Sequence, residues 1–414
     1  MFFRKKISSA TEKRYKKALC LDFNKYRGDF VKQRNLRLSG DGVAPSISFE
    51  QTPYSDEIYR AIFRQNGYLI ALKKDQGLCR FNDKWSYSFL GQLTEDGVIS
   101  HVKYQGATVF SCSRGTYLTV NGIEATEINN NFYPSLAVSG DRLFGVCGNS
   151  LSMTEAGDIS SWDDTRTVYA HTQLDAVVAL DKLYALGDTC YTFSPDAEEI
   201  DAKFHPFCYG IGAVQPESVA RFDKRAIFAT TNGLYQLKNG VITPVFIQLN
   251  DFVSFNGCVA CAYKGKYVVA CKRKNGDASA KDIVLVLDLD TDLVCAVLDV
   301  EPQHISTVDG VLYAVFNDKL FYATDGQVEG SFCQKVDFGC SNVKYLDKIA
   351  IRTHTDAQVW IGNGAEKRRY DFKGRKTIQT AKLLGSGRAF YVEVQAQDGI
   401  KLDYLELFAH SYEV

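Results

Sequence analysis

The sequence repeats one short pattern seven times, and this repeat limits the possible folds more than any other feature. Each copy has a turn residue, a run of strand-forming residues, a second turn and another strand, and successive copies begin about 40 residues apart. The equivalent apolar positions are Leu69, Val109, Leu143, Leu183, Ile227, Tyr267 and Leu312. A period of this length is typical of one small β-sheet per repeat.

Polar pairs mark the turns inside several copies. Asn232-Gly233 and Asn317-Asp318 are examples, and each precedes a run rich in Leu, Tyr or Phe. Such residues tolerate the positive φ angle that two-residue hairpin turns require, so the pairs predict hairpins between antiparallel strands. Aromatic residues make up 13% of the chain, which suits such strands. Each copy therefore predicts three to four short antiparallel strands.

One such sheet cannot bury both of its faces, whereas sheets stacked around an axis bury them against each other and leave only short edges. The repeat therefore predicts an all-β fold with a seven-bladed β-propeller over residues 44–342. A β-solenoid has shorter rungs, and a large sandwich has no reason to repeat at this interval. Six or eight blades stay open, because the segment 44–50 could supply a closing strand.

The repeat stops after about Asn342. Residues 343–414 instead alternate apolar and polar side chains, as in Tyr391–Val394 and Leu402–Leu407, with glycines between such runs. Alternation of this kind is typical of strands that bury one face. The sequence predicts a small C-terminal β-sandwich over 343–414.

The start of the chain is strongly basic. Residues 1–38 contain twelve Lys and Arg against three acidic residues, although the whole chain has a net charge of −1. We interpret residues 1–43 as a basic attachment arm that either neutralises the phosphates of a nucleic acid or docks on an acidic neighbouring subunit. The candidate binding residues are Lys13, Arg14, Lys16, Lys17, Lys25, Arg27, Lys32, Arg34 and Arg37.

The cysteines indicate a reducing compartment. Twelve of them are scattered through apolar runs and lack the close, regular spacing of a secreted disulfide scaffold. No apolar run of signal-peptide length follows the basic start, and no apolar stretch is long enough to span a bilayer. We therefore expect free thiols, no export signal and no membrane-spanning helix.

The chain lacks the common signatures of catalysis and of metal binding. The usual phosphate-binding, dinucleotide-binding, metalloprotease and nucleophile-elbow motifs are all missing. Cys258 and Cys261 form one C-x-x-C without the second pair that a zinc site needs. Aspartates alternate over 288–292 with calcium-loop spacing, but Leu293 occupies the position of the required glycine. We expect no enzyme activity, no catalytic residue, no metal and no cofactor.

Short motifs along the whole chain carry a resemblance to one family. They are Gly28-Asp29-Phe30, Arg34-Asn35-Leu36 and Pro45 near the start, then Gly157–Trp162, Thr231–Tyr235, Leu285–Asp290 and the ending Tyr404–Val414. In this order and spacing the chain resembles the β-propeller structural proteins of tailed phages and prophages. It is similar, more distantly, to the tail accessory protein that retains packaged DNA in short-tailed phages.

The resemblance implies a structural virion protein, assembled in the host cytoplasm, with the propeller as a platform in the tail or head-to-tail assembly. It also implies a symmetric ring or multimer, attached to other phage structural proteins through the arm and the C-terminal domain. Packaged DNA is a further partner that the resemblance allows. The alternative function is a glycan-binding or glycan-hydrolysing β-propeller with its site at one face of the channel.

Overall fold

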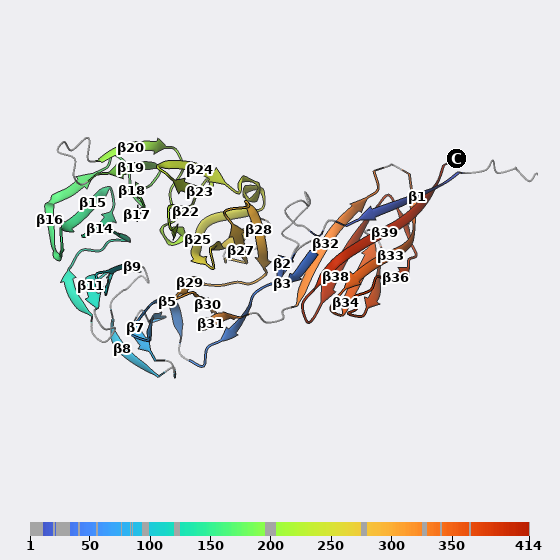
Figure 1. Ribbon diagram of the computed structural model, residues 1–414, viewed down its shortest axis with the longest axis horizontal. Coiled ribbons are helices and arrows are strands. Elements are labelled where there is room, and N and C mark those ends of the chain that lie inside the picture. Colours follow the sequence, from blue (N-terminus) through green and yellow to red (C-terminus); the bar gives the residue numbers. More distant parts are fainter. Residues whose placement is uncertain are drawn as a thin grey trace, which may run out of the picture. The chain divides into compact units, whose positions relative to one another are not determined.

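The computed structural model of the chain (Figure 1) describes residues 11–19, 21, 34–39, 42–54, 57–75, 77–82, 84, 86–92, 99–119, 125–194, 204–274, 280–324, 329–339, 342–363 and 366–413. Apart from the short 3-10 helices η2 (Pro216–Ser218) and η3 (Ile247–Asp251), the regular elements of these residues are β-strands. The contacts divide the chain into two compact units. Unit 1 comprises Met1–Ser48, Val294–Asp299 and Thr324–Val414, and unit 2 comprises Phe49–Leu293 and Val300–Ala323.

Unit 2 consists of antiparallel sheets that follow one another along the chain. Five four-stranded sheets are each built from four consecutive strands. The first sheet contains β5 (Ile58–Gln65), β6 (Tyr68–Lys73), β7 (Gly77–Phe81) and β8 (Tyr87–Gln92), and the second contains β9 (Ile99–Tyr104), β10 (Ala107–Cys112), β11 (Gly115–Thr119) and β12 (Thr126–Asn129). The third sheet contains β13 (Ser135–Ser139), β14 (Arg142–Cys147), β15 (Ser150–Glu155) and β16 (Asp158–Tyr169), and the fourth contains β17 (Ala176–Ala179), β18 (Leu183–Leu186), β19 (Thr189–Phe193) and β20 (Phe204–Tyr209). The fifth sheet contains β21 (Ala220–Phe222), β22 (Arg225–Thr230), β23 (Gly233–Lys238) and β24 (Val241–Val245).

The series continues with two further groups of strands. The first contains β25 (Val253–Tyr263), β26 (Lys266–Arg273) and β27 (Ile283–Asp288). The second is a four-stranded sheet of β29 (His304–Val308), β30 (Val311–Phe316), β31 (Lys319–Thr324) and β4 (Ser48–Gln51). Because β4 precedes every other strand of unit 2, its place beside β31 joins the beginning of the unit to its end.

Two-residue turns with positive φ close several of the hairpins. Asn66-Gly67 has φ angles of 48° and 80° between β5 and β6. The predicted turn at Asn317-Asp318 has φ angles of 48° and 61° between β30 and β31. This backbone geometry matches the twist of the flanking strands. The hairpin predicted at Asn317-Asp318 is therefore confirmed.

The apolar positions of the repeat lie in the cores between sheets. Each is on the second strand of its sheet and is at most 2% exposed; they are Leu69, Val109, Leu143, Leu183, Ile227, Tyr267 and Leu312. One apolar cluster joins the first sheet to the last, since it contains Leu69 and Phe81 together with Tyr313 and Leu320. Figure 1 shows the sheets in a ring.

This arrangement confirms the predicted all-β fold and its β-propeller. The number of blades stays a prediction, because the group β25–β27 is not a four-stranded sheet within unit 2.

Unit 1 combines both ends of the chain in two sheets. One sheet has the order β32 (Gly330–Asp337), β38 (Ala389–Ala396), β34 (Ala357–Gly362) and β35 (Lys367–Phe372). The other contains, in order, β28 (Leu293–Leu298), β2 (Leu36–Ser39), β3 (Gly42–Pro45), β39 (Leu402–Glu413), β33 (Lys344–Thr353) and β36 (Gln379–Lys382). In addition, β1 (Thr11–Ala18) pairs with β39 and β37 (Ser386–Gly387) pairs with β33.

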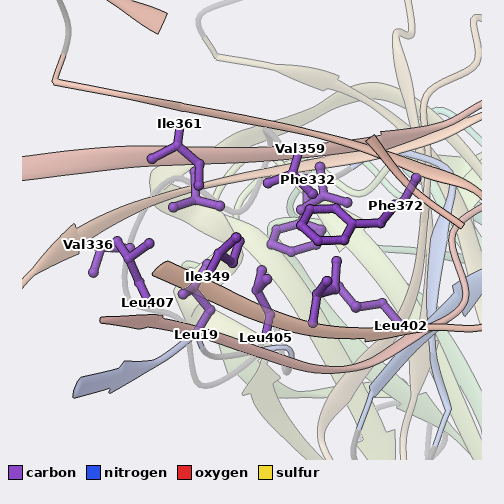
Figure 2. Close-up of a cluster of buried hydrophobic side chains, with 14 of the residues drawn as sticks. Leu19, Phe332, Val336, Ile349, Val359, Ile361, Phe372, Leu402, Leu405 and Leu407 are labelled. Carbon is purple, nitrogen blue, oxygen red and sulfur yellow. The ribbon is translucent and has the colours of Figure 1, made fainter. Parts of the chain in front are cut away.

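Alternating side chains of the two sheets form one hydrophobic core. Figure 2 shows Val359 and Ile361 of β34 directed towards Ile349 of β33 and Leu405 of β39. Leu19, from the predicted arm, lies in the same cluster and is also buried. Burial of this kind contributes roughly 25 cal/mol for each Å² of apolar surface removed from water.

The division into units differs from the predicted boundaries at 43/44 and 342/343. Strands β1, β2 and β3, predicted as arm and propeller edge, belong to unit 1, and so does β32, predicted as propeller. The physical reason is strand pairing, since β1 pairs with β39 and β32 pairs with β38. Neither partner is near its strand in the sequence.

Candidate functional site

The structure places the predicted basic residues on several elements. Lys13, Arg14, Lys16 and Lys17 lie on β1, which pairs with β39 from Thr11 opposite Glu413 to Ala18 opposite Glu406. Arg34 forms an isolated bridge to Ser331 and an ion pair with Asp299, with 3.4 Å between Nε and Oδ2. Arg37 lies on β2 opposite Ala296. The predicted residues Lys25, Arg27 and Lys32 lie outside the described residues.

The described part of the predicted arm is a strand of unit 1, which corrects the prediction of a separate segment. The backbone N–H of Leu19 donates to the carbonyl oxygen of Leu405 at 2.9 Å, and Leu19 and Leu21 are buried in the core of unit 1. Tyr15 donates or accepts a hydrogen bond with Ser411 at 3.1 Å. This basic segment is therefore part of the fold through Tyr15, Leu19 and its strand pairing, while the four cations of β1 are exposed.

The outer face of β39 carries aromatic side chains beside these cations. Tyr412, His410 and Phe408 lie opposite residues 12, 14 and 16 of β1, and Tyr345 of β33 lies opposite His410 on the other side. We define the aromatic–basic face as Arg14, Lys16, Tyr345, Lys348, Lys382, Phe408, His410 and Tyr412. Sequence analysis missed the aromatic members, Lys348 and Lys382, because they come from β33, β36 and β39, which are distant from the basic segment in the sequence.

The rings of this face contact one another. Tyr345 stacks on His410 with 5.4 Å between ring centroids, and His410 meets Tyr412 edge to face at 5.2 Å. Tyr345 and Tyr412 are nevertheless 44% and 51% exposed. Because the rings support each other, they present flat apolar surface at little further cost in side-chain entropy.

Lysines surround Phe408 in the neighbouring row of the same face. The Nζ atoms of Lys348 and Lys16 lie 4.6 Å and 5.8 Å from the centroid of the Phe408 ring. Lys348 lies directly opposite Lys382 on β36. The face therefore has an aromatic part and an adjacent cationic part.

Carboxylates neutralise part of this charge. Arg14 pairs with Glu12 at 2.9 Å and Lys16 with Glu406 at 2.9 Å. His410 Nδ1 forms a hydrogen bond with Asp347 at 2.6 Å. Burial raises the pKa of Glu406, but hydrogen bonds from Tyr404 and Lys16 outweigh it, so this pKa lies below its usual range. Glu406 is therefore ionised at neutral pH.

In unit 2, strands of several sheets surround a cavity of about 990 Å³. Arg60 of β5 extends into the surrounding wall, where its Nη1 donates to Glu217 Oε1 at 2.5 Å and to His304 Nε2 at 3.3 Å. Its Nη2 donates to the carbonyl oxygen of Ile99. The guanidinium thus connects elements from four places along the chain.

The electrostatics of this cluster favour a stable internal contact. Burial raises the pKa of Glu217, but contacts with His304, Arg60 and Lys281 outweigh it and lower this pKa to about 2. Burial lowers the pKa of His304, although its contact with Glu217 acts in the opposite direction. Burial also raises the pKa of the neighbouring Cys258 thiol to about 12, which makes it a poor nucleophile.

A third surface feature lies on β8, the last strand of the first sheet of unit 2. Tyr87 and Phe89 are 48% and 56% exposed. The Tyr87 ring lies 5.5 Å from the buried ring of Tyr54 and 6.0 Å from that of Phe81. The Phe89 ring lies over Gly77, where it occupies the space that a Cβ atom would need. We call Tyr87 and Phe89 the blade-edge aromatic pair.

In the described part of the chain, no group of three or more His, Cys, Asp or Glu side chains could hold a metal ion. Asp288, from the rejected calcium loop, instead pairs with Lys266. Within the same residues, no helix is long and apolar enough to cross a membrane.

The fold defines an all-β protein with a β-propeller. No protein-family model matches the chain, and no curated protein matches its sequence. Among solved structures, the chain is similar to the WD40 β-propeller domain of Doa1, with 10% identity, a TM-score of 0.46, and coverage of 70% of this chain and 96% of that one. It is similar to the Neurospora crassa Pan2 WD40 domain, with 10% identity, a TM-score of 0.45, and coverage of 68% and 96%.

A third similar structure is PorZ, a surface component of the type-IX secretion system of Porphyromonas gingivalis. The identity is 10%, the TM-score is 0.44, and the match covers 82% of this chain and 45% of that one.

Proposed function

We propose that the chain is a non-catalytic assembly protein of a tailed-phage virion. In this proposal the propeller is a rigid platform for other structural proteins, and unit 1, built from both chain ends, attaches it within the tail or head-to-tail assembly. The resemblance of the sequence to phage propeller proteins supports the setting, including assembly in the host cytoplasm. The fold supports the role of a platform, because its sheets are packed into one ring.

The blade-edge aromatic pair is the observation that carries the proposal. Exposed aromatic side chains are enriched at the centres of protein interfaces, where they contribute most of the binding energy. Tyr87 packs against the buried rings of Tyr54 and Phe81, and Phe89 packs on Gly77, so both are held in place before any partner arrives. Such preorganisation lowers the entropy cost of binding.

The alternative function, a glycan-binding or glycan-hydrolysing propeller, would use the cavity of unit 2. Arg60, Glu217 and His304 in its wall are already engaged, since Arg60 bonds Glu217, His304 and the backbone of Ile99. A glycan would therefore have to displace these contacts to use any of the three side chains. Incubation of the purified protein with a glycan array and a panel of glycosides tests it directly.

The proposed function is tested by incorporation into particles. We expect the double variant Tyr87→Ala/Phe89→Ala to enter purified virions at least about tenfold less than the unchanged chain, because two interface anchors are lost. Quantitative mass spectrometry of the particles measures this. The control is Tyr169→Ala, which removes an exposed aromatic side chain from the strand β16. Equal incorporation of the double variant would place the interface elsewhere, and absence of the unchanged chain from particles would refute the virion role.

A further inference from the structure

The aromatic–basic face contains an arrangement that folding alone does not favour. Lys348 and Lys382 lie directly opposite each other on β33 and β36. Their neighbours Ile349 and Ala381 point into the core of unit 1, so both lysines point outwards. Like charges directly opposite in an antiparallel pair destabilise a sheet.

Nearby carboxylates do not relieve this repulsion. Among the described residues no ion pair joins an acid to Lys348 or Lys382, whereas Arg14 and Lys16 pair with Glu12 and Glu406. Unrelieved repulsion between like charges on an exposed surface is typical of a functional site, where a bound ligand supplies the opposite charge. The missing partner here is an anion.

The second property of the face is its stacking surface. The half-exposed rings of Tyr345 and Tyr412 lie on the same side of the sheet as the lysines, next to the row that contains Phe408. Successive side chains on one face of an antiparallel strand are about 7 Å apart. Anionic contacts and flat apolar contacts are therefore available to one ligand at neighbouring positions.

We propose that this face binds single-stranded nucleic acid, with phosphates over Lys348 and Lys382 and bases stacked on Tyr345 and Tyr412. Proteins that bind single strands combine a cationic track with aromatic rings in this way, because every base has a flat face. A duplex keeps its bases inside and would use only the lysines. The inference goes beyond the proposed function, which concerns protein partners.

Binding is measured by fluorescence anisotropy with a labelled oligothymidine of about 20 nucleotides, long enough to span the face. Two phosphate contacts predict that log K falls against log salt with a slope of about −1.4. Lys348→Gln/Lys382→Gln should weaken binding about tenfold at low salt and bring the slope close to zero. Tyr345→Ala/Tyr412→Ala should weaken binding by about tenfold or more with an unchanged slope.

The matched controls lie on the other sheet of unit 1. Arg368→Gln removes an exposed cation from β35, and Tyr391→Ala removes an exposed ring from β38, so both should bind as the unchanged chain does. Melting curves verify that each variant is folded, and Tyr412→Leu replaces the double tyrosine variant if that one is not. Three outcomes overturn the proposal: no binding, equal binding of a duplex or of polyphosphate, or equal weakening by the controls.

Discussion

Arg60 is a buried cation whose partners lie far away in the sequence. Glu217 and His304 are 157 and 244 residues from it. A buried charge is tolerated only when it is paired and hydrogen-bonded, and removal of one partner leaves the rest of the network unsatisfied. We infer that this residue fixes the inner ends of several sheets relative to each other within unit 2.

We expect Arg60→Met to lower the free energy of unfolding of unit 2 by about 3 kcal/mol, since a buried ion pair is broken and the Ile99 carbonyl loses its donor. Glu217 is 42% exposed and can be hydrated, which places the loss at the lower end of the usual range. Urea unfolding followed by circular dichroism measures it.

The control for this prediction is Arg225→Met, because Arg225 pairs with the exposed Asp290 at 2.7 Å. That pair lies at the surface, so its loss should cost less than about 1 kcal/mol. Similar losses in both variants would show that the Arg60 cluster contributes no more than a surface ion pair.

At the scale of single strands, alternation decides which residues form the core. Leu312 and Val311 are neighbours on β30, yet Leu312 is 1% exposed and Val311 is exposed at the surface. Leu312 is one of the seven positions that the repeat predicts as equivalent. Substitutions at Leu312 and Val311 therefore test two predictions together: the alignment of the seven repeat copies, and which face of β30 is buried.

We expect Leu312→Asp to abolish folding of unit 2, because an unpaired charge would be buried at a cost of several kcal/mol. Val311→Asp should stay within about 1 kcal/mol of the unchanged chain, since its side chain is solvated. Thermal melting of soluble protein measures both. A cooperative, unshifted transition of Leu312→Asp would contradict the equivalence of the repeat positions.

The sequence predicted those features that depend on neighbouring residues. The repeat positions and the turn at Asn317-Asp318 are local signals, so the sheets of the propeller could be predicted from them. The pairing of β1 with β39 could not, because Tyr15 and Ser411 are 396 residues apart and alternation does not specify a partner strand. For the same reason the sequence predicted Arg14 and Lys16 of the aromatic–basic face, but neither its rings nor Lys348 and Lys382.

At the scale of the whole molecule, both ends of the chain contribute to unit 1 while the middle forms unit 2. Deletion of the predicted arm therefore removes β1, Leu19 and Leu21 from a folded core. A truncated chain cannot test attachment alone, which is why single exposed side chains are the appropriate variants.

The cysteines also belong to this scale, because they are spread over both units. The ten described cysteines, all but Cys20 and Cys340, are free thiols, and Cys147 is exposed among them. Others are buried, and burial raises the pKa of Cys190 and of Cys258 to about 12. Since the thiolate is the reactive form, access and pKa together make these buried thiols slow to react.

We therefore expect alkylation of the native protein to modify Cys147 first, and Cys147→Ser to remove this fast reaction while the slow ones remain. After denaturation without reductant, anaerobically purified protein should expose close to all twelve thiols of the sequence, as expected for assembly in a reducing cytoplasm. Mass spectrometry of the alkylated chain counts them and identifies each site. A count of six or fewer thiols after denaturation would contradict that expectation, because the remaining cysteines would then have to be oxidised. Rapid modification of Cys190 or Cys258 in the native protein would contradict their burial.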